Sequence, residues 1–156
     1  MSLFPSRKYD SGTLWCVWRW TDVDPEGDGE TYLTRLHLFR VPWCSCMLHW
    51  IVRPDPQPDL HDHPVSFLSI VLSGYYDEEI LNTDGSLRTV RIKWWNFKRA
   101  TDRHRIVSLG GHLLTLVFGG PAVREWGFHT ADGWLPWREY VARRRKESSR
   151  ESAASR

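Results

Sequence analysis

Three histidines form the pattern in this sequence that is most suggestive of chemistry. His61 and His63 flank Asp62, and His104 follows about forty residues downstream. Because residues two apart in a β-strand project from the same face, one extended segment directs both His61 and His63 at a single point. Two convergent imidazoles suit a transition metal, and a third imidazole from another strand completes a ligand triad. The sequence therefore predicts a metal site at His61, His63 and His104, if a β-fold brings His104 to the pair.

The elements that must position these histidines are short strands separated by turn signals, with almost no helical periodicity. Asn82–Ser86 has the composition of a hairpin turn, and Trp134–Arg145 is expected to form a terminal segment with a short helix. Strands of this length and spacing favour an all-β sandwich or barrel. They are expected at Leu14–Trp20, Thr31–Arg40, Cys44–Val52, Val65–Tyr76, Glu78–Leu81, Leu87–Lys93, Arg103–Leu109, Leu113–Phe118 and Val123–His129.

Length and charge favour one domain with distinct ends. The 156 residues suffice for a single core. We expect an N-terminal arm with a short strand at residues 1–30, a barrel at 31–140 and a basic, Ser/Arg-rich disordered tail at 141–156. The net charge of +2 hides an asymmetry, because residues 143–156 carry six basic and two acidic side chains. Binding to nucleic acid is therefore expected only through this tail.

Targeting signals and cysteines narrow the class further. No apolar run is long enough to cross a membrane, and the first residues lack a secretory pattern, so a cytoplasmic protein without membrane contact is expected. The three cysteines cannot form a closed disulfide framework. Cys44 and Cys46 alternate like the histidines, which leaves a zinc site of both pairs as an alternative, although small buried side chains on a strand are favoured.

The motifs around the histidines resemble those of the cupins, which are small β-barrels of the jelly-roll type. His61-Asp62-His63, followed by Ser69-Ile70-Val71-Leu72-Ser73-Gly74, is similar to the first cupin motif. Arg99–Ile106 carries His104 ahead of the strand Leu113–Phe118, as in the second motif. The resemblance covers roughly residues 30–130, and Glu125–Thr130 with Trp134–Arg138 is similar to a group of small cupins from bacteria and phages. It implies a single-domain, all-β jelly-roll barrel.

One position departs from the family pattern. The usual first motif has a glutamate ligand about five residues after its second histidine, where this chain has Leu68. No carboxylate occurs within Pro64–Tyr76. The resemblance then implies either an abandoned site or three neutral histidines with open positions, similar to the iron sites of thiol and diketone dioxygenases. Asp62 is expected to point away from the pair.

The resemblance implies a metal-dependent enzyme as the favoured function. Ferrous iron on the three histidines is expected to serve an oxygenase or dioxygenase that acts on a small metal-chelating molecule such as a thiol, diketone or enol. A non-redox isomerase, epimerase or lyase with zinc, manganese or nickel remains an alternative, with Glu78, Glu79 or another histidine as base. A non-catalytic barrel that binds a small molecule is the third. Pairing of two barrels into a homodimer through their sheets stays open.

Several further side chains are candidates for the pocket. His49 is expected to be a satisfied core histidine that reaches the pocket only if its strand lines the barrel. His112 is expected in a turn, and it replaces His104 only if the register slips. His37 and His129 are expected to be structural or to support a metal ligand without touching the ion. Arg35, Arg103 and Arg105 are candidates to clamp a substrate carboxylate. Tyr32, Tyr75 and Tyr76 could donate hydrogen bonds in the pocket. Trp94, Trp95 and Trp126 could form a wall of the pocket.

Overall fold

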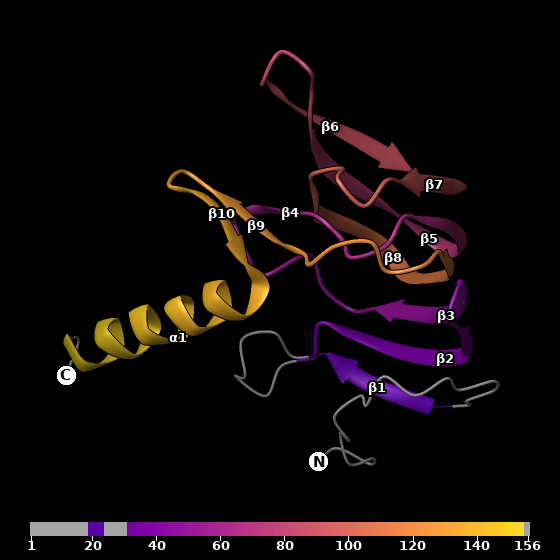
Figure 1. The fold of residues 1–156 in the computed structure, drawn as a ribbon, viewed down its shortest axis with the longest axis horizontal. Coiled ribbons are helices and arrows are strands. Elements are labelled where there is room, and N and C mark those ends of the chain that lie inside the picture. The colour runs from indigo at the N-terminus through magenta and orange to yellow at the C-terminus, as the bar shows by residue number, and fades with distance from the viewer. Residues whose placement is uncertain (1–18, 24–30, 155–156) are drawn as a thin grey trace.

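The computed structural model describes residues 19–23 and 31–154 (Figure 1). The expected strand Leu14–Trp20 lies mostly outside these residues, and the first described strand begins at Arg19. The elements are β1 Arg19–Val23, β2 Leu33–Val41, β3 Cys44–Ile51, β4 Leu60–His61, β5 Phe67–Leu81, β6 Leu87–Ile92, β7 Trp95–Lys98, β8 His104–Gly119, β9 Gly127–Thr130, β10 Gly133–Pro136 and α1 Trp137–Ala154.

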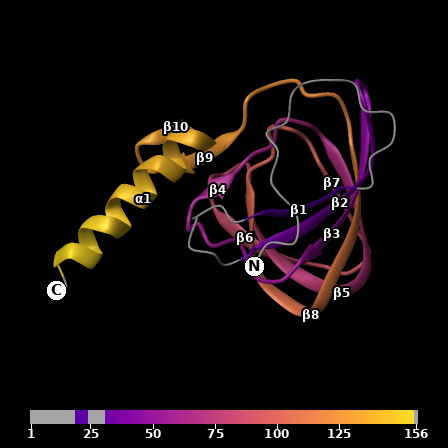
Figure 2. The ribbon, with the colours of Figure 1, turned by 90° about the horizontal axis from the view of Figure 1, so that it is seen from below.

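The strands form one antiparallel sheet that curls around an interior (Figure 2). Its main path runs β1-β2-β3-β8-β4-β9-β10, and β5 pairs with β6, β7 and β8. The two longest strands, β5 and β8, lie side by side from the Phe67–Gly119 pair to the Ile80–His104 pair. Toward its C-terminal end β8 also pairs with β3, and at His104 it pairs with β4. The all-β barrel predicted from the strand pattern is confirmed.

Strand pairing assigns side chains to the two faces of the sheet, because directly opposed residues share a face. Arg35 of β2 opposes His49 of β3, and His49 opposes Thr115 of β8. One step along the strands, Leu33 opposes Ile51, which opposes Leu113. These three apolar residues belong to the buried core together with Tyr76 and Ile106. The barrel interior therefore contains an apolar layer and, next to it, a layer of polar side chains.

Strand β8 is longer than the sequence suggested. Gly110-Gly111 indicated a break between two strands, but β8 runs through them as one strand, and β5 pairs with it on both sides of an irregularity, at Leu114 and at Gly110. Gly111 has a φ of 80°, a backbone conformation that glycine adopts without strain. At Gly110 a Cβ atom would lie 2.0 Å from the Tyr75 ring, so only glycine leaves room for that ring. Both glycines fit an irregular long strand rather than a turn.

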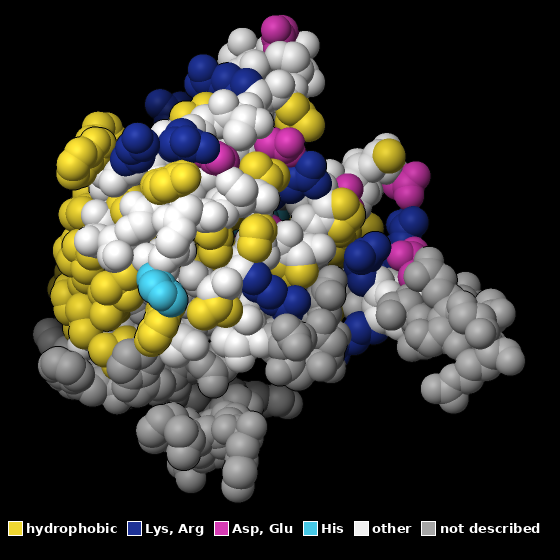
Figure 3. Space-filling view, turned by 180° about the vertical axis from the view of Figure 1, so that it is seen from behind, with side chains coloured by type: hydrophobic (Ala, Val, Ile, Leu, Met, Phe, Trp, Pro, Cys, Tyr) yellow, Lys and Arg dark blue, Asp and Glu magenta, His cyan; other side chains and the backbone are white. Residues whose placement is uncertain are grey.

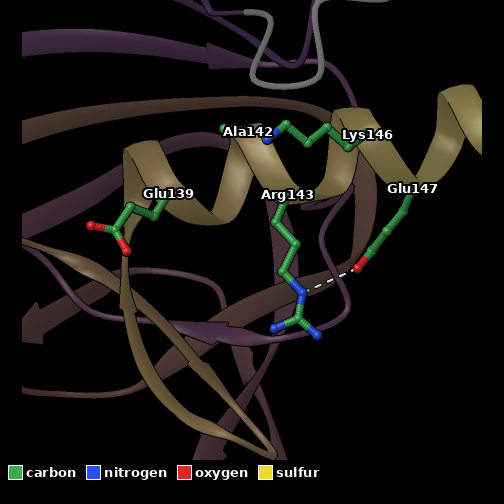
Figure 4. Close-up of a pocket in the computed structure, with 5 residues that line it drawn as sticks. All are labelled: Glu139, Ala142, Arg143, Lys146 and Glu147. Carbon is green, nitrogen blue, oxygen red and sulfur yellow. Dashed lines mark hydrogen bonds and ion pairs between the residues drawn. The ribbon is translucent and has the colours of Figure 1, made fainter.

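Helix α1 occupies part of the segment for which the sequence predicts a disordered tail. It continues to Ala154 and projects from one side of the barrel (Figure 2). No proline or glycine interrupts it, and Arg143 pairs with Glu147 one turn later, at 3.1 Å (Figure 4). A shallow hollow on its exposed face is lined by this pair with Glu139, Ala142 and Lys146. Among the described residues, no helix is long and apolar enough to span a membrane.

Candidate metal centre

The structure brings His61, His63 and His104 together at one end of the barrel interior. His61 ends β4 and pairs with His104, the first residue of β8. His63 follows two residues after His61, and its backbone N–H donates to the carbonyl of Ala100. The three side chains each offer a ligand atom, and these atoms all lie within 4.8 Å of one another. The three histidine side chains thus converge on one point, as expected from the alternation of side chains along a strand.

The orientation of the rings fits a bound ion. Nε2 of His63 lies 2.7 Å from Nε2 of His104. Two nitrogens that bind one ion at about 2.1 Å, at right angles, are about 3 Å apart. Glu78 accepts a hydrogen bond from Nδ1 of His104 at 2.9 Å, and because a carboxylate only accepts, Nδ1 carries the hydrogen. The Nε2 lone pair of His104 is therefore directed at His63, where a metal ion would share both nitrogens.

Glu78 is the centre of a buried polar network behind His104. Its side chain is almost fully buried. Oε1 accepts hydrogen bonds from Nζ of Lys98 at 2.5 Å and from Nδ2 of Asn96 at 3.0 Å. Asn96 also contacts the Tyr76 hydroxyl at 3.1 Å. The sequence suggested Glu78 only as a general base, but the structure shows it holding the ring of a candidate ligand.

A second carboxylate stands behind His61. Oδ2 of Asp55 lies 3.8 Å from Nδ1 of His61 and accepts the backbone N–H of Ile106 at 2.6 Å. The Tyr32 side chain also hydrogen-bonds to Asp55, and burial with this carboxylate raises the Tyr32 pKa well above its usual value. Asp55 lies in a proline-rich segment, and the sequence reasoning missed it. Its signal in the sequence was an acid six residues before the first histidine of the pair, in a segment whose other acid is Asp59.

The residue of β5 that faces the centre is Phe67 and not Leu68. The Phe67 ring lies 4.7 Å from the His63 ring, centroid to centroid, in an edge-on arrangement. Leu68 instead opposes Phe97 and Phe118, on the other face of the sheet. The family resemblance placed the missing glutamate one residue too late, because a single-residue shift reverses the face of a strand. A phenyl ring thus occupies the side of the centre where a carboxylate was sought.

The three arginine candidates lie in different environments. Nε of Arg35 donates to Nε2 of His49 at 3.0 Å in the polar layer of the interior. Arg105 pairs with Glu79 at 2.6 Å and also contacts the carbonyl of Pro58. Arg103 is exposed. Among them, Arg35 shares the interior with the histidines, so the strand of His49 does line the barrel.

The charge state of the interior histidines suits metal binding. Burial, reinforced by His61 and His104, lowers the pKa of His63 well below 6.5. Burial also lowers the pKa of His104, with His61 and Lys98 contributing, and that of His49, with Arg35 contributing. His49, His63 and His104 are consequently neutral near pH 7. The neutral imidazole is the form in which histidine binds metals.

Aromatic side chains form a wall behind His61. The rings of Phe128 and Trp126 lie 5.8 and 6.2 Å from the His61 ring. Trp126 stacks on Trp137 of α1, and Phe128 stacks on Tyr140 of the same helix. The start of α1 therefore supports the candidate site. Of the three tryptophans proposed as a wall, the structure places Trp126 here, whereas Trp94 and Trp95 are 77% and 65% exposed.

Asp62 points away from the centre, as expected, and ties down the segment that follows β8. It is fully buried. Oδ1 accepts the backbone N–H of Gly127. Oδ2 lies 3.0 to 3.1 Å from nitrogen atoms of Arg124, His129 and Trp134. This single carboxylate thus connects the histidine pair to β9 and β10, and His129 has the structural role predicted for it.

The alternative ligands do not join the cluster. In the described part of the chain, the group of ligand atoms close enough for one ion consists of the three histidines. Cys44 contacts the carbonyl of Ser45, and Cys46 is buried. His112 is exposed beside Trp50 and does not replace His104. The zinc site of cysteines and histidines is therefore not formed in this structure.

Comparison with known proteins bears on the fold. No protein-family model and no curated protein matches the sequence. The Fe(II) form of HppE in complex with substrate matches with a TM-score of 0.51 and 13% identity, over 71% of this chain and 62% of that one. A variant of oxalate decarboxylase from Bacillus subtilis matches with a TM-score of 0.50 and 11% identity, over 74% of this chain and 31% of that one. An RmlC-like cupin from Shewanella frigidimarina has a TM-score of 0.46 and 16% identity, over 67% of this chain and 84% of that one.

Identities this low make the likeness one of fold. It confirms the jelly-roll barrel implied by the motifs around His61 and His104. Fold, motifs and the convergence of the histidines lead to the same result: the chain folds as a cupin, with three histidines placed to hold a metal ion.

Proposed function

We propose that the protein is a metal-dependent enzyme, and that it uses ferrous iron in an oxygenase reaction on a small molecule that chelates the metal. The observation that carries this proposal is the convergence of the three imidazoles of His61, His63 and His104, with Phe67 rather than a carboxylate beside them. A neutral ligand set leaves the ion its full positive charge, which favours the binding of an anionic chelating substrate. The structural likeness to Fe(II) HppE supports iron as the metal to test first.

His61, His63 and His104 would hold the ion. Bound there, iron would supply the redox chemistry and would keep coordination positions open for substrate and dioxygen. The residues of this chain fix the ligand geometry: Glu78 orients His104, and Asp55 stands behind His61. Phe67, Trp126 and Phe128 place apolar surface around the histidines, which limits the access of water.

Arg35 is the side chain best placed to orient a substrate anion. His49 accepts its Nε–H, which fixes the guanidinium on the inner face. Its charge contributes to the low pKa of His63, so its field reaches the centre. Arg105 is already paired with Glu79 and serves as the matched control. Arg35→Met is expected to raise KM for a carboxylate-bearing substrate at least tenfold, while Arg105→Met leaves KM unchanged.

The second candidate is a non-redox reaction with the metal as Lewis acid. Such a reaction needs a base near the substrate. Glu78 is bound by His104 and Lys98, and Glu79 by Arg105, so neither acid suits this role. His49 lies on the inner face as a neutral imidazole, and its Nε2 accepts the Nε–H of Arg35, so this nitrogen becomes free to take a proton when Arg35 turns to the substrate anion. This placement makes His49 the base to test in an isomerase, epimerase or lyase.

Metal analysis and iron loading test the two proposals. Protein purified without chelators is expected to contain about one metal ion per chain, and the double variant His61→Ala/His63→Ala none. Equal metal content in both proteins would overturn both candidate functions. In anaerobically iron-loaded protein, nitric oxide is expected to give the electron paramagnetic resonance signal of an open ferrous position. Oxygen uptake with thiols, diketones or enols then supports the oxygenase, whereas turnover of a substrate without oxygen supports the Lewis-acid reaction.

A further inference from the structure

Lys98 places a positive charge inside the barrel. Lysine and arginine side chains normally lie on the surface, where Figure 3 shows them gathered beside an area of hydrophobic side chains. Lys98 is instead only 6% exposed. Taking a charge out of water costs free energy unless the charge is paired or bound. The groups around this ammonium therefore indicate its role.

Strand pairing places Lys98 beside the candidate metal centre. Lys98 of β7 opposes Phe67 of β5, and the ring of Phe67 contacts the ring of His63. Nζ of Lys98 lies 2.5 Å from Oε1 of Glu78, whose other oxygen accepts the hydrogen bond from His104. The charge of Lys98 contributes to the low pKa of both His63 and His104. The ammonium group is therefore close to two of the three candidate ligands.

A pocket of about 330 Å³ opens next to Lys98, which is enough for a small molecule. It is lined by Ile80, Leu81, Lys98, Thr101, Asp102 and Arg103. Ile80 opposes His104 in the register of β5 and β8, so the pocket lies at the end of the barrel that holds the histidines. An ammonium group has three N–H donors, and within the described residues Glu78 accepts one of them. Donors of Lys98 therefore remain for an acceptor on a molecule bound here.

The charges around the histidines balance before any metal ion is added. Four charged side chains shift the pKa values of the buried histidines and tyrosines of the interior, namely Arg35, Lys98, Asp55 and Glu78. Two are positive and two are negative, and Asp102 and Arg103 in the pocket wall also cancel. A divalent ion at the centre would add two positive charges. Because buried net charge is unfavourable, the complete site favours a substrate with two negative charges.

The two interior cations reach the centre from different strands. Arg35 belongs to β2 and Lys98 to β7, at opposite ends of the strand order β2-β3-β8-β5-β7. Both contribute to the low pKa of His63, so both face the same part of the interior. A molecule bound at the histidines therefore meets a cation from two directions.

We propose that Lys98 and the pocket that it lines form a subsite for an acidic group of the substrate, and that the substrate is a small molecule with two acidic groups, the second of which reaches Arg35. The inference rests on the proposed function, because it takes the bound molecule to be the substrate of the metal centre. A carboxylate accepts N–H donors of Lys98 in charge-assisted hydrogen bonds. Glu78 keeps its contacts with His104 and Asn96 and shares the ammonium group with the substrate.

Binding of two matched acids to the zinc-loaded, full-length protein tests the subsite. Succinate and butyrate have the same number of carbon atoms, but succinate carries two carboxylates and butyrate carries one. Zinc is not redox-active, so calorimetric titration measures binding without turnover. At constant ionic strength, the wild type is expected to bind succinate at least tenfold more tightly than butyrate. Lys98→Met and Arg35→Met each remove one cation, and each is expected to bind the two acids with nearly equal affinity.

A second comparison separates the charge of Lys98 from its support of Glu78. Lys98→Met leaves the buried Glu78 charge without its partner, whereas Glu78→Gln removes that charge. Glu78→Gln is expected to retain the preference for succinate, and Glu78→Gln/Lys98→Met is expected to lose it. Asn96→Ala is the matched control, because it removes another donor to the same oxygen of Glu78 but no charge, and it is expected to retain the preference. Circular dichroism and metal content show that each variant is folded and saturated with zinc.

The outcomes distinguish the subsite from the proposed reaction. Equal affinities of the wild type for succinate and butyrate would overturn the subsite, as would a preference that persists in Glu78→Gln/Lys98→Met. A preference that depends on Lys98, in a protein that consumes no oxygen when loaded with iron, would overturn the oxygenase reaction alone. A wild type that binds no metal would overturn both.

Discussion

Glu78 shows how a single residue can support a metal centre without touching the ion. Phe67 stands on the side of the centre where a carboxylate ligand was sought, and the nearest acid from β5 reaches Nδ1 of His104 instead. There it fixes the tautomer and makes the opposite nitrogen a better ligand. Lys98 shares the charge of Glu78 at 2.5 Å. The negative charge therefore acts on the metal through an imidazole.

Glu78→Gln is expected to weaken metal binding by 10- to 100-fold, on the order found for residues that orient metal ligands. A glutamine is isosteric but cannot provide the negative charge that strengthens His104 as a ligand. Competition with a chelator of known affinity measures the change, at a temperature where circular dichroism shows the variant to be folded. Glu79→Gln is the matched control, because Glu79 pairs with Arg105 rather than with a histidine. Equal affinities of the two variants would contradict the role assigned to Glu78.

The interior histidines predict how stability of the metal-free protein depends on pH. Burial lowers the pKa values of His49, His63 and His104 well below 6.5, so the folded chain leaves them unprotonated. The unfolded chain takes up these protons at about pH 6.5. Below that pH the unfolded state binds more protons, and the free energy of unfolding must fall as pH falls. Each histidine contributes up to about 1.4 kcal/mol per pH unit.

Urea denaturation between pH 8 and pH 5 measures this dependence. His49→Gln removes one buried imidazole. Below pH 6.5 the free energy of unfolding of this variant is therefore expected to fall less steeply with falling pH than that of the wild type, by the contribution of one proton. His112→Gln, at an exposed position, is expected to leave the slope as in the wild type. A free energy of unfolding that stays constant down to pH 5 would be incompatible with neutral, buried histidines.

At the scale of single residues, the sequence predicted which side chains share one face of a strand, because side chains alternate between the two faces. His61 and His63 share a face because they are two apart, and the second motif identified His104. The choice between Phe67 and Leu68 required the register of β5, which one residue reverses. Glu78 and Asp55 were not predicted as supports of the histidines. Glu78 contacts His104, 26 residues away, and Asp55 lies near His61, 6 residues away, and only the folded chain brings these side chains together. Arg35 was distinguished from Arg103 and Arg105 only by strand pairing.

At the scale of elements, the C-terminal part of the chain is attached to the centre by Asp62. This buried carboxylate holds Gly127 of β9 and Trp134 of β10. At Gly127 a Cβ atom would lie 2.0 Å from the carbonyl oxygen of Leu135, so β9 and β10 approach closely there. Trp137 and Tyr140 of α1 then stack on the aromatic wall behind His61. Strands β9 and β10 and the start of α1 therefore act as one support.

Asp62→Ala is expected to destabilise the protein by about 3 kcal/mol or more, because it leaves buried donors and the Arg124 charge without their acceptor. Amide hydrogen exchange is expected to accelerate most in β9, β10 and the first turns of α1. Asp132→Ala provides the control: its ion pair with Arg143 is exposed and contributes less than about 1 kcal/mol. If exchange in β9 and β10 were unchanged in Asp62→Ala, Asp62 would not be the link described.

The sequence predicted elements where a local pattern is strong. The strands from Thr31 to Val52 and the hairpin at Asn82–Ser86 appear within a few residues of their expected positions. Glycines misled the prediction within β8, because Gly110 serves the packing of Tyr75 rather than a turn. The extent of α1 was missed since its basic and serine-rich composition resembles that of disordered tails, whereas its first turn is anchored by Tyr140, whose hydroxyl donates to Asp59 at 2.7 Å.

At the scale of the whole molecule, the three histidines lie where the short strand β4 joins β8 to β9. His104 begins the long central strand β8, whereas His61 and His63 belong to the segment that joins β8 to β9 in the sheet. Strand β4 contains two residues, so few backbone hydrogen bonds hold this junction. An ion bound by all three histidines would cross-link the central strands to the part of the fold that carries the aromatic wall.

Metal binding is therefore expected to stabilise the whole fold. A ligand that binds only the folded state at 100 times its Kd adds about 2.7 kcal/mol to the free energy of unfolding. Thermal unfolding of the chelator-treated protein, repeated with added Fe(II) under argon or with Zn(II), measures this gain as a rise in Tm. Hydrogen exchange is expected to slow most around β4, β9 and the start of β8. The variant His61→Ala/His63→Ala is expected to keep the Tm of the metal-free protein at every metal concentration, because one imidazole alone cannot form the cross-link. A rise in Tm that is equal in this variant would place the bound metal elsewhere on the chain.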